Sequence, residues 1–269
     1  MRKTAIFVLF VFLASIASAS SFQSPSETPV QRIEDDTTAG LELWQTMLGQ
    51  LWIPSPGEYV IKHLQWEQVV EKVYHHPLVH VRPGDVVIDC GAHIGAFTRV
   101  ALRAGARVVV AIEPEEANLV AFRRNFKQEM KTGQVKLVAK GVWDTTGKLP
   151  LHLSSVGDSH SVVIPQNTAK EETIEVTTLD ALVVSLKLAR VDFIKMDIEG
   201  AEQKALHGAR QLLVHWQPRL AISSYHLKGD PAAICSIVWQ ARADYLVVSK
   251  DRVKAYEGTF VPKVLFFYR

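Results

Sequence analysis

Beyond Val86 the chain alternates between short apolar runs and segments with apolar residues at helical spacing. Runs of the first kind predict strands, and segments of the second kind predict helices. The elements predicted here, in chain order, are strand Val86–Ile88, helix Phe97–Ala104, strand Arg107–Ile112, helix Glu115–Met130 and strand Val135–Val142. Because strands that alternate with helices are joined by right-handed crossovers, we expect an α/β fold with a parallel sheet.

Upstream of this region the pattern is less regular. Residues 20–40 are rich in Ser, Thr, Pro and acidic side chains without apolar periodicity, which predicts a flexible linker. Residues 41–80 carry aromatic and aliphatic side chains at mixed spacing, as at Trp44, Leu48 and Trp52, and we expect an N-terminal helical cap. The main domain is then expected over residues 81–269.

The first 19 residues have the pattern of an export signal. Arg2 and Lys3 precede the apolar run Ala5–Ala14, and small residues follow at Ala17–Ala19. This predicts a signal peptide or an N-terminal membrane anchor, and with it export or membrane attachment. The alternative is a mis-assigned start, with Met47 as the true first residue and a cytoplasmic protein.

Composition restricts the partners of the protein. Of 269 residues, 48% are hydrophobic and 22% charged, which fits one globular domain with a short appendage. The formal net charge is +2 with Lys and Arg scattered along the chain, so no nucleic-acid partner is expected. The two cysteines, Cys90 and Cys235, lie in apolar stretches and are expected in the core rather than in a disulfide.

The turn after the first strand is a candidate cofactor loop. In parallel sheets ligands bind beyond the carboxyl ends of the strands, where Asp89–Gly95 is expected. The segment lacks the second glycine of a dinucleotide fingerprint and the Lys and Ser/Thr of a phosphate-binding loop, and Asp89 would repel a phosphate. Glu113 ends the next strand, where an acid can accept hydrogen bonds from ribose hydroxyls. A nucleoside with positive charge, such as S-adenosylmethionine, suits both acids, although Asp89 as a helix cap and Glu113 as a strand end are the alternative.

A second strand followed by a turn occurs at Val191–Glu202. Asp197 and Glu199 stand at its carboxyl end, and Gly200 permits the turn into the next helix. We therefore expect two more acids at the same sheet edge.

These segments resemble the FkbM family of S-adenosylmethionine-dependent methyltransferases. The resemblance covers roughly Gly57–Arg269 and is carried by the following motifs in the family's order: DCGAHIGAFT, VVAIEPEEANLVAFRRNF, TTLDAL, DFIKMDIEGAE and LAISSYH. It implies a Rossmann-like class I methyltransferase fold, a seven-stranded mostly parallel sheet with helices on both faces. The final strands would be Leu220–Tyr225, Tyr245–Ser249 and Val264–Tyr268.

The resemblance also implies a cofactor site. The turn after the first strand would hold the methionine end of the cofactor, Glu113 its ribose, and the segment Gly141–Asp144 would pass near adenine. The cofactor-binding residues expected in this way are Asp89, Gly91, Ala92, His93, Gly95, Glu113, Pro114, Val142, Trp143 and Asp197. His93 either contacts the ligand or fills space behind the turn.

The expected catalytic residues are His226, Asp197 and Glu199. A hydroxyl that attacks the sulfonium methyl must lose its proton, and a histidine has a pKa close to working pH, so His226 is favoured as the base over Asp197. The alternative is that Asp197 caps a helix and His226 bonds a loop carbonyl. Two carboxylates without further ligands argue only weakly for a metal, and none is expected. Other family members carry a glutamate where this chain has Ser223-Ser224, which bears on activity if that glutamate takes part in the chemistry.

An insertion follows the third strand. Short strands are predicted at Leu149–Leu153, Ser161–Ile164 and Ile174–Thr177, followed by a helix at Leu179–Leu188, and together the strands would form a β-ribbon beside the cofactor edge. Its turn, Ser154–His160, either reaches over the acceptor or is an exposed tip without a role.

Three functions remain open from the sequence. The first is O-methylation of a hydroxyl on a sugar or other small molecule with S-adenosylmethionine as methyl donor. The second is an exported or envelope-bound binding module that keeps the fold without turnover, and the third is another Rossmann-like nucleotide enzyme. The fold alone does not choose among them, and the oligomeric state is not predicted.

Overall fold

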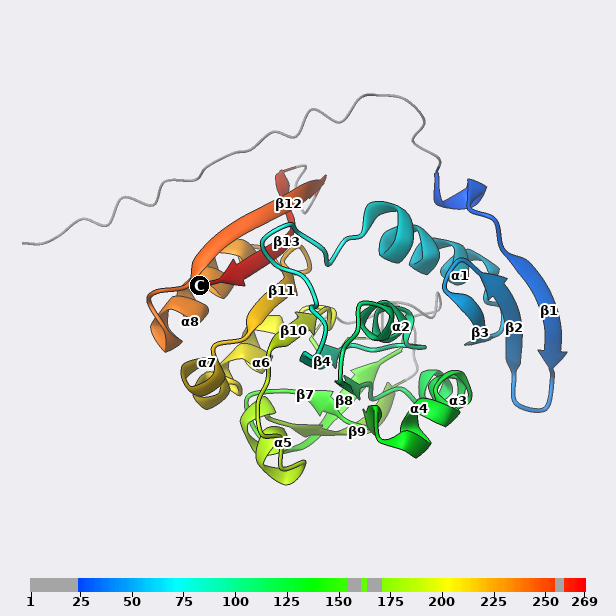
Figure 1. The fold of residues 1–269 in the computed structure, drawn as a ribbon, viewed down its shortest axis with the longest axis horizontal. Helices are drawn as coiled ribbons and strands as arrows, with labels where there is room; N and C mark the ends of the chain where they lie inside the picture. The colour runs from blue at the N-terminus through cyan, green and yellow to red at the C-terminus, as the bar shows by residue number, and fades with distance from the viewer. Residues whose placement is uncertain (1–23, 154–160, 164–170, 255–258) are drawn as a thin grey trace, which may run out of the picture.

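A computed structural model describes residues 24–153, 161–163, 171–254 and 259–269 (Figure 1). The predicted signal or anchor at residues 1–19 and the predicted turn at residues 154–160 lie outside this part of the chain. Within it, every helix is too short or too polar to cross a membrane.

The centre of the molecule is a seven-stranded sheet with the order β12-β13-β11-β10-β4-β5-β6. Strands β11, β10, β4, β5 and β6 are parallel, whereas β13 runs antiparallel to both β11 and β12. The seven strands are β4 (Val86–Cys90), β5 (Val108–Ile112), β6 (Val135–Val138), β10 (Phe193–Met196), β11 (Arg219–Ser223), β12 (Leu246–Lys254) and β13 (Phe260–Tyr268). The mostly parallel sheet expected from the sequence is confirmed.

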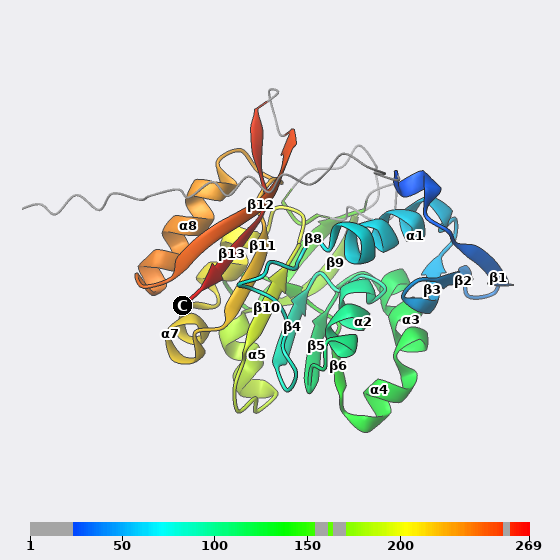
Figure 2. The same cartoon turned by 45° about the horizontal axis from the view of Figure 1, so that its top comes forward.

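Both faces of the sheet are buried, which explains the continuous apolar runs in its strands. In β5, Val109 and Ala111 pack on one side with Phe97 and Phe122, whereas Val110 and Ile112 pack on the other. Helices α2 and α3 therefore cover one face, and helices α5 to α8 cover the opposite face (Figures 1 and 2). The helices are α1 (Glu58–Gln65), α2 (Ala96–Arg103), α3 (Glu116–Asn125), α4 (Lys127–Thr132), α5 (Leu179–Ser185), α6 (Glu202–His207), α7 (Arg210–Trp216) and α8 (Asp230–Ala241).

Two predicted elements are divided in the structure. The predicted helix Glu115–Met130 breaks at Phe126, which lies fully buried between α3 and α4. The predicted strand Val135–Val142 ends at Val138, and β7 (Gly141–Val142) pairs with a different sheet. The chain thus leaves the central sheet after Val138 and enters the sheet of the insertion at β7.

The predicted helical cap is wrong over its first half. Residues 41–54 form strands, and only residues 58–71 are helical, as α1 and the π-helical segment η2 (Trp66–Glu71). The predicted linker is also partly a strand, because residues 31–36 add the third strand of an antiparallel sheet. The strands of this N-terminal sheet are β1 (Gln31–Asp36), β2 (Leu41–Thr46) and β3 (Gly49–Pro54).

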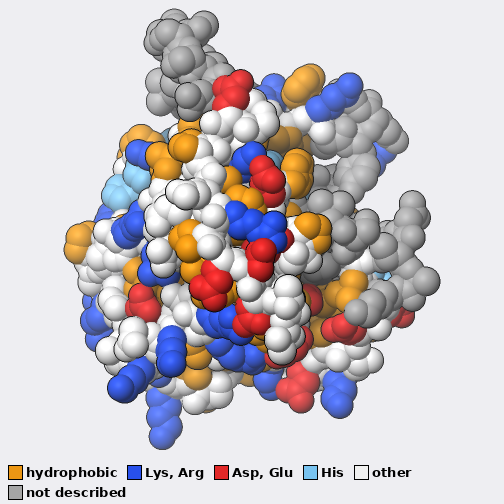
Figure 3. Space-filling model, turned by 90° about the vertical axis from the view of Figure 1, so that its right-hand side faces the viewer, with side chains coloured by type: hydrophobic (Ala, Val, Ile, Leu, Met, Phe, Trp, Pro, Cys, Tyr) orange, Lys and Arg blue, Asp and Glu red, His pale blue; other side chains and the backbone are white. Residues whose placement is uncertain are grey.

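The N-terminal sheet packs against the main domain rather than standing apart from it. Leu51 and Ile53 share a buried cluster with Ile94 and Ala121, and the Asn125 side chain bonds the backbone N–H and C=O of Trp52. Positive and negative side chains are mixed on the side of the molecule that carries this sheet (Figure 3). Arg124 of α3 pairs with Asp36 of β1 at 2.7 Å. Val60 and Ile61 of α1 belong to the same buried cluster as Leu51, so α1 packs on the main domain together with the sheet.

The insertion forms a small sheet with the order β7-β9-β8, as the predicted ribbon suggested. Its longer strands are β8 (Gly147–His152) and β9 (Glu171–Thr177), which are antiparallel. The strand predicted at Ser161–Ile164 is not formed over residues 161–163, where Ser161 makes only an isolated bridge to His152.

Candidate functional site

A cavity of about 200 Å³ lies beyond the carboxyl ends of β4, β5 and β10. Of the residues expected to bind cofactor or to act in catalysis, it is lined by Gly91, Ala92, His93, Glu113, Pro114, Val142, Asp197 and Glu199. These residues are brought together from three strand ends and from the start of the insertion. Most of the predicted site residues therefore lie together around one cavity.

Gly91 begins the cavity wall at the end of β4. Its φ is +75°, and a Cβ atom there would lie 1.9 Å from the backbone oxygen of Asp197. Only glycine tolerates both the backbone conformation and this close approach. The glycine thus allows the turns after β4 and β10 to touch, which places Asp197 beside the predicted cofactor loop.

Asp89 lies beneath the cavity and is not part of its lining. The side chain is fully buried, accepts a hydrogen bond from the Thr98 hydroxyl and pairs with the Lys195 ammonium at 3.2 Å. Lys195 also donates to the backbone carbonyls of Cys90 and Gly91. This carboxylate therefore joins β4 to α2 and β10 and supports the loop from below, and its contact with the cofactor stays a prediction.

Gly95 and Trp143 also lie outside the cavity lining. Gly95 has φ +94° and begins α2, and a Cβ atom there would lie 2.1 Å from Phe126, so the glycine is required for packing. Trp143 packs instead on the small sheet of the insertion, with Lys204 over its ring. Of the predicted adenine pair Val142 lines the cavity and Trp143 does not, and the cofactor contacts of Gly95 and Trp143 stay predictions.

Glu113 is a buried acid at the end of β5. Its carboxylate accepts hydrogen bonds from the backbone N–H groups of His93 and Glu115, at 2.9 and 3.0 Å, and from the Asn118 amide. Burial raises the pKa of Glu113 to about 7, although these hydrogen bonds favour the charged form. A carboxylate retains lone pairs beyond the ones these donors use, so it can also accept from a ribose.

His93 takes a left-handed backbone conformation, with φ +51°, and lines the cavity. Because its N–H bonds Glu113, it joins the turn after β4 to the end of β5. Both roles expected of His93 are therefore compatible with its position.

Asp197 occupies the end of β10 and faces the cavity. Its Oδ2 accepts a hydrogen bond of 2.6 Å from the Tyr74 hydroxyl, which also lies 3.3 Å from the Ser223 hydroxyl. Burial raises the pKa of Asp197, but the charges of Lys195 and His226 outweigh burial and lower it. Asp197 is thus held ionised beside the space where a ligand would bind.

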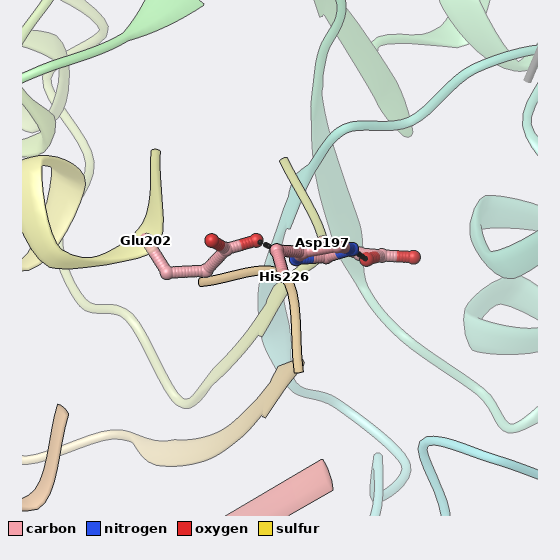
Figure 4. Close-up of side chains that lie close together, drawn as sticks. All are labelled: Asp197, Glu202 and His226. Carbon is pink, nitrogen blue, oxygen red and sulfur yellow. Dashed lines mark hydrogen bonds and ion pairs between the residues drawn. The ribbon is translucent and has the colours of Figure 1, made fainter. Parts of the chain in front are cut away.

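His226 stands behind Asp197, between acidic side chains (Figure 4). Its Nδ1 lies 3.0 Å from Glu202 Oε1, and its Nε2 lies 3.5 Å from Asp197 Oδ1 and 3.6 Å from Glu199 Oε2. Burial lowers the pKa of His226, but Glu202, followed by Asp197 and Glu199, outweighs it and raises the pKa to about 10. The expectation of a pKa near working pH is therefore corrected, because at neutral pH this ring already carries the proton a base would have to accept.

The far wall of the cavity comes from α1 and η2, to which the sequence assigned no part in the site, and from the insertion, which was expected beside the cofactor edge. Helix α1 and segment η2 contribute Val60, His63, Leu64, Glu67 and Gln68. The insertion contributes Leu151, Val162, Ile174 and Val176. Ser161 links the insertion to the turn after β10, since its hydroxyl donates to the backbone oxygen of Glu199. This wall combines apolar side chains with a few polar ones, as small-molecule sites do.

The residues missed at the centre of the site are Tyr74, Lys195 and Glu202. Lys195 offered a signal, because a charged residue inside the buried strand FIKM requires a partner. Tyr74 offered none, since its contact with Asp197 spans 123 positions of sequence.

Comparison with known proteins identifies relatives of this chain. The family model described as the methyltransferase FkbM domain matches residues 89–247. The 31-O-demethyl-FK506 methyltransferase FkbM of Streptomyces tacrolimicus is 24% identical over 229 residues, covering 74% of this chain and 86% of that protein.

One solved structure shares the fold, and a second is less similar. The methyltransferase FkbM of Methylobacillus flagellatus KT has a TM-score of 0.53 and 22% identity, and the match covers 79% of this chain and 54% of that one. The magnesium protoporphyrin IX methyltransferase of Synechocystis PCC 6803, solved with bound S-adenosylmethionine, has a TM-score of 0.44 and 13% identity over 79% of this chain and 83% of that one.

Proposed function

The chain belongs to the FkbM family of S-adenosylmethionine-dependent methyltransferases, and on this basis we propose that it methylates a hydroxyl oxygen of a small molecule such as a sugar. The observation that carries the proposal is that Asp197 and Glu199 line the same cavity as Glu113 and the turn after β4. The name of the Streptomyces relative, which refers to an O-demethyl substrate, supports oxygen as the atom methylated.

The proposed cofactor position follows the strand ends. The methionine part lies along Gly91, Ala92 and His93, the ribose hydroxyls donate to Glu113, and the adenine lies toward Val142, all of which line one wall of the cavity. Asn118 and Lys140 line the same wall and are added to the set. The positive sulfonium then lies toward the acidic end of the cavity, where Asp197 and Glu199 compensate its charge.

In the proposed transfer the acceptor hydroxyl attacks the methyl carbon in line with the C–S bond. The new O–C bond forms as the C–S bond breaks, its electron pair stays on sulfur, and the hydroxyl proton passes to one of the two carboxylates at the cavity wall, Asp197 or Glu199. Holding the two reactants in this geometry supplies much of the rate enhancement. His226, oriented by Glu202, acts through Asp197 and Glu199 rather than as the base.

The wall made by α1, η2 and the insertion is proposed to hold the acceptor. Its polar members, His63, Glu67 and Gln68, offer hydrogen bonds, and Ile174 and Val176 offer an apolar surface. A compact polyhydroxy compound with one apolar face suits such a wall.

The proposal is tested by incubating the full chain with S-adenosylmethionine carrying a labelled methyl group and a panel of sugars and small phenols. Label that becomes attached to a hydroxyl oxygen, and is lost with Asp197→Asn, is the expected result. A folded protein that binds the cofactor yet labels only nitrogen or carbon nucleophiles contradicts the oxygen assignment. A folded protein that does not bind the cofactor contradicts catalysis altogether and favours a binding module.

A further inference from the structure

Four side chains form what we call the acid–histidine cluster: Asp197, Glu199, Glu202 and His226. Asp197, Glu202 and His226 each present one ligand atom, and these three atoms lie within 4.8 Å of one another. They come from the ends of β10 and β11 and from the first turn of α6, so the fold fixes their mutual positions (Figure 4). Such a set of oxygen and nitrogen atoms has the composition of a metal site.

Two carboxylate oxygens of this cluster are buried without a hydrogen bond from any described residue. They are Glu202 Oε2 and Asp197 Oδ1. The Glu202 side chain has no exposed surface at all, and its carboxylate points toward His226 (Figure 4). Asp197 Oδ1 faces His226 Nε2 at 3.5 Å, whereas Glu202 Oε2 has no such neighbour among the described residues. Because a buried carboxylate oxygen without a donor costs free energy, Glu202 Oε2 indicates a positively charged ligand.

The charges of the cluster point the same way. Three carboxylates surround a single imidazole, and Asp230, also fully buried, lies next to them with its Oδ1 bonded to Gln203. Lys195 is already paired with Asp89. Even a protonated His226 therefore leaves the cluster with a net negative charge.

We infer that Asp197, Glu202 and His226 bind a divalent first-row cation of the Mn²⁺ type, which displaces the proton of the His226 ring as it binds. Carboxylate oxygens suit Mn²⁺ and Mg²⁺, whereas an imidazole nitrogen favours a transition metal, so the mixed set points to Mn²⁺. Asp197 Oδ2 is occupied by the Tyr74 hydroxyl, which leaves Oδ1 as the ligand atom and fixes its direction.

The cation would stand at the cavity wall, because Asp197 belongs to both the cluster and the lining. Its role rests on the proposed methyl transfer: the acceptor oxygen binds the cation, which weakens the O–H bond, and the proton passes to Glu199 as the oxygen takes the methyl group. Binding of the cation itself does not depend on that proposal.

The test is a titration of the full chain with MnCl₂. Bound metal is first removed from the protein with EDTA, and the EDTA is then removed by dialysis. The electron paramagnetic resonance signal of free Mn²⁺ measures binding. We expect one ion per chain, with affinity at least about tenfold weaker in Glu202→Gln and in His226→Gln. The control is Glu116→Gln, which changes an exposed glutamate of α3 and should leave the affinity unchanged. Circular dichroism verifies that each variant is folded.

Calorimetry with S-adenosylmethionine on the same samples separates this inference from the proposed function. A wild-type protein that binds S-adenosylmethionine but not Mn²⁺ overturns the cation site and leaves the methyltransferase proposal standing. Mn²⁺ binding that is equal in wild type, Glu202→Gln and His226→Gln also overturns it. Mn²⁺ binding that these variants lose, in a protein that does not bind S-adenosylmethionine, supports the site and contradicts the function.

Discussion

The two walls of the cavity are built in different ways. The wall proposed to hold the cofactor, called here the cofactor wall, consists mainly of the turns directly after β4 and β5, where each residue is placed by the strand next to it in sequence. Asn118, Lys140 and Val142 complete it. The acceptor wall consists of α1, η2 and the insertion, which reach the cavity only because the N-terminal sheet and the small sheet pack on the central domain. The first wall is therefore a property of local sequence, and the second is a property of tertiary packing.

The support beneath the cofactor wall gives the largest expected effect. Lys195→Met leaves Asp89 as an unpaired buried charge and removes two backbone contacts, so we expect the free energy of unfolding to fall by about 3–5 kcal/mol. Lys204→Met is the control, since its pair with Asp144 is exposed and worth about 0–1 kcal/mol. Urea denaturation measures both, and equal losses would show that the buried pair does not support the wall.

The junction of the two walls gives the next effect. Asp197→Asn keeps the shape of the side chain and its contact with Tyr74 but removes the charge, and we expect turnover with the identified acceptor to fall about a hundredfold. Asp244→Asn, which alters a surface acid near the end of the chain, serves as the comparison. Turnover by Asp197→Asn within twofold of wild type would show that the charge of Asp197 is not required for methyl transfer.

Glu113 makes the cofactor wall sensitive to pH. Its pKa of about 7 in the folded protein lies above the ordinary value, so the side chain loses its charge as the pH falls through 7. Only the ionised carboxylate accepts from both ribose hydroxyls, and affinity for S-adenosylmethionine should therefore fall about tenfold per pH unit below that value. Calorimetric titrations at pH 8, 7 and 6 test this, and Glu113→Gln should abolish the dependence. A wild-type affinity that does not vary with pH would contradict the ribose assignment.

The smallest effect concerns a contact between the walls. Tyr74→Phe removes the hydroxyl that donates to Asp197, and since Asp197 is partly exposed we expect a loss of only about 1 kcal/mol of unfolding free energy. Tyr59→Phe, at an exposed tyrosine of α1, should change nothing. A Tyr74→Phe protein with the same free energy of unfolding as Tyr59→Phe would mean that the Tyr74 hydroxyl does not stabilise the fold.

The same contrast explains what the sequence allowed us to predict. The sheet, the turn at Gly91, and the acids Glu113 and Asp197 follow from strand patterns and from the rule that ligands bind at strand ends. The pairing of Asp89 with Lys195 and the close approach of Gly95 to Phe126 were not predictable, because they depend on how α2 and α3 pack.

The N-terminal sheet was predicted as helices for a physical reason. The aromatic and aliphatic side chains of this segment, among them Trp44, Leu48 and Leu51, have a mixed spacing that a helix also allows. Gly49, with φ +96°, instead turns the chain between β2 and β3. Pairing of β2 with β3 then buries Leu41 and Ile53 against the main domain. Tertiary contacts thus outweighed a local pattern that fitted both structures.

The central claim is that this cavity binds S-adenosylmethionine with its ribose on Glu113. The most direct test is calorimetric titration of the cofactor into the full chain at pH 8, beside Glu113→Ala and the surface control Glu116→Gln. The account predicts micromolar binding that is at least about tenfold weaker in Glu113→Ala and unchanged in Glu116→Gln. A folded wild-type protein that does not bind the cofactor, or a Glu113→Ala protein that binds it equally well, would contradict the account.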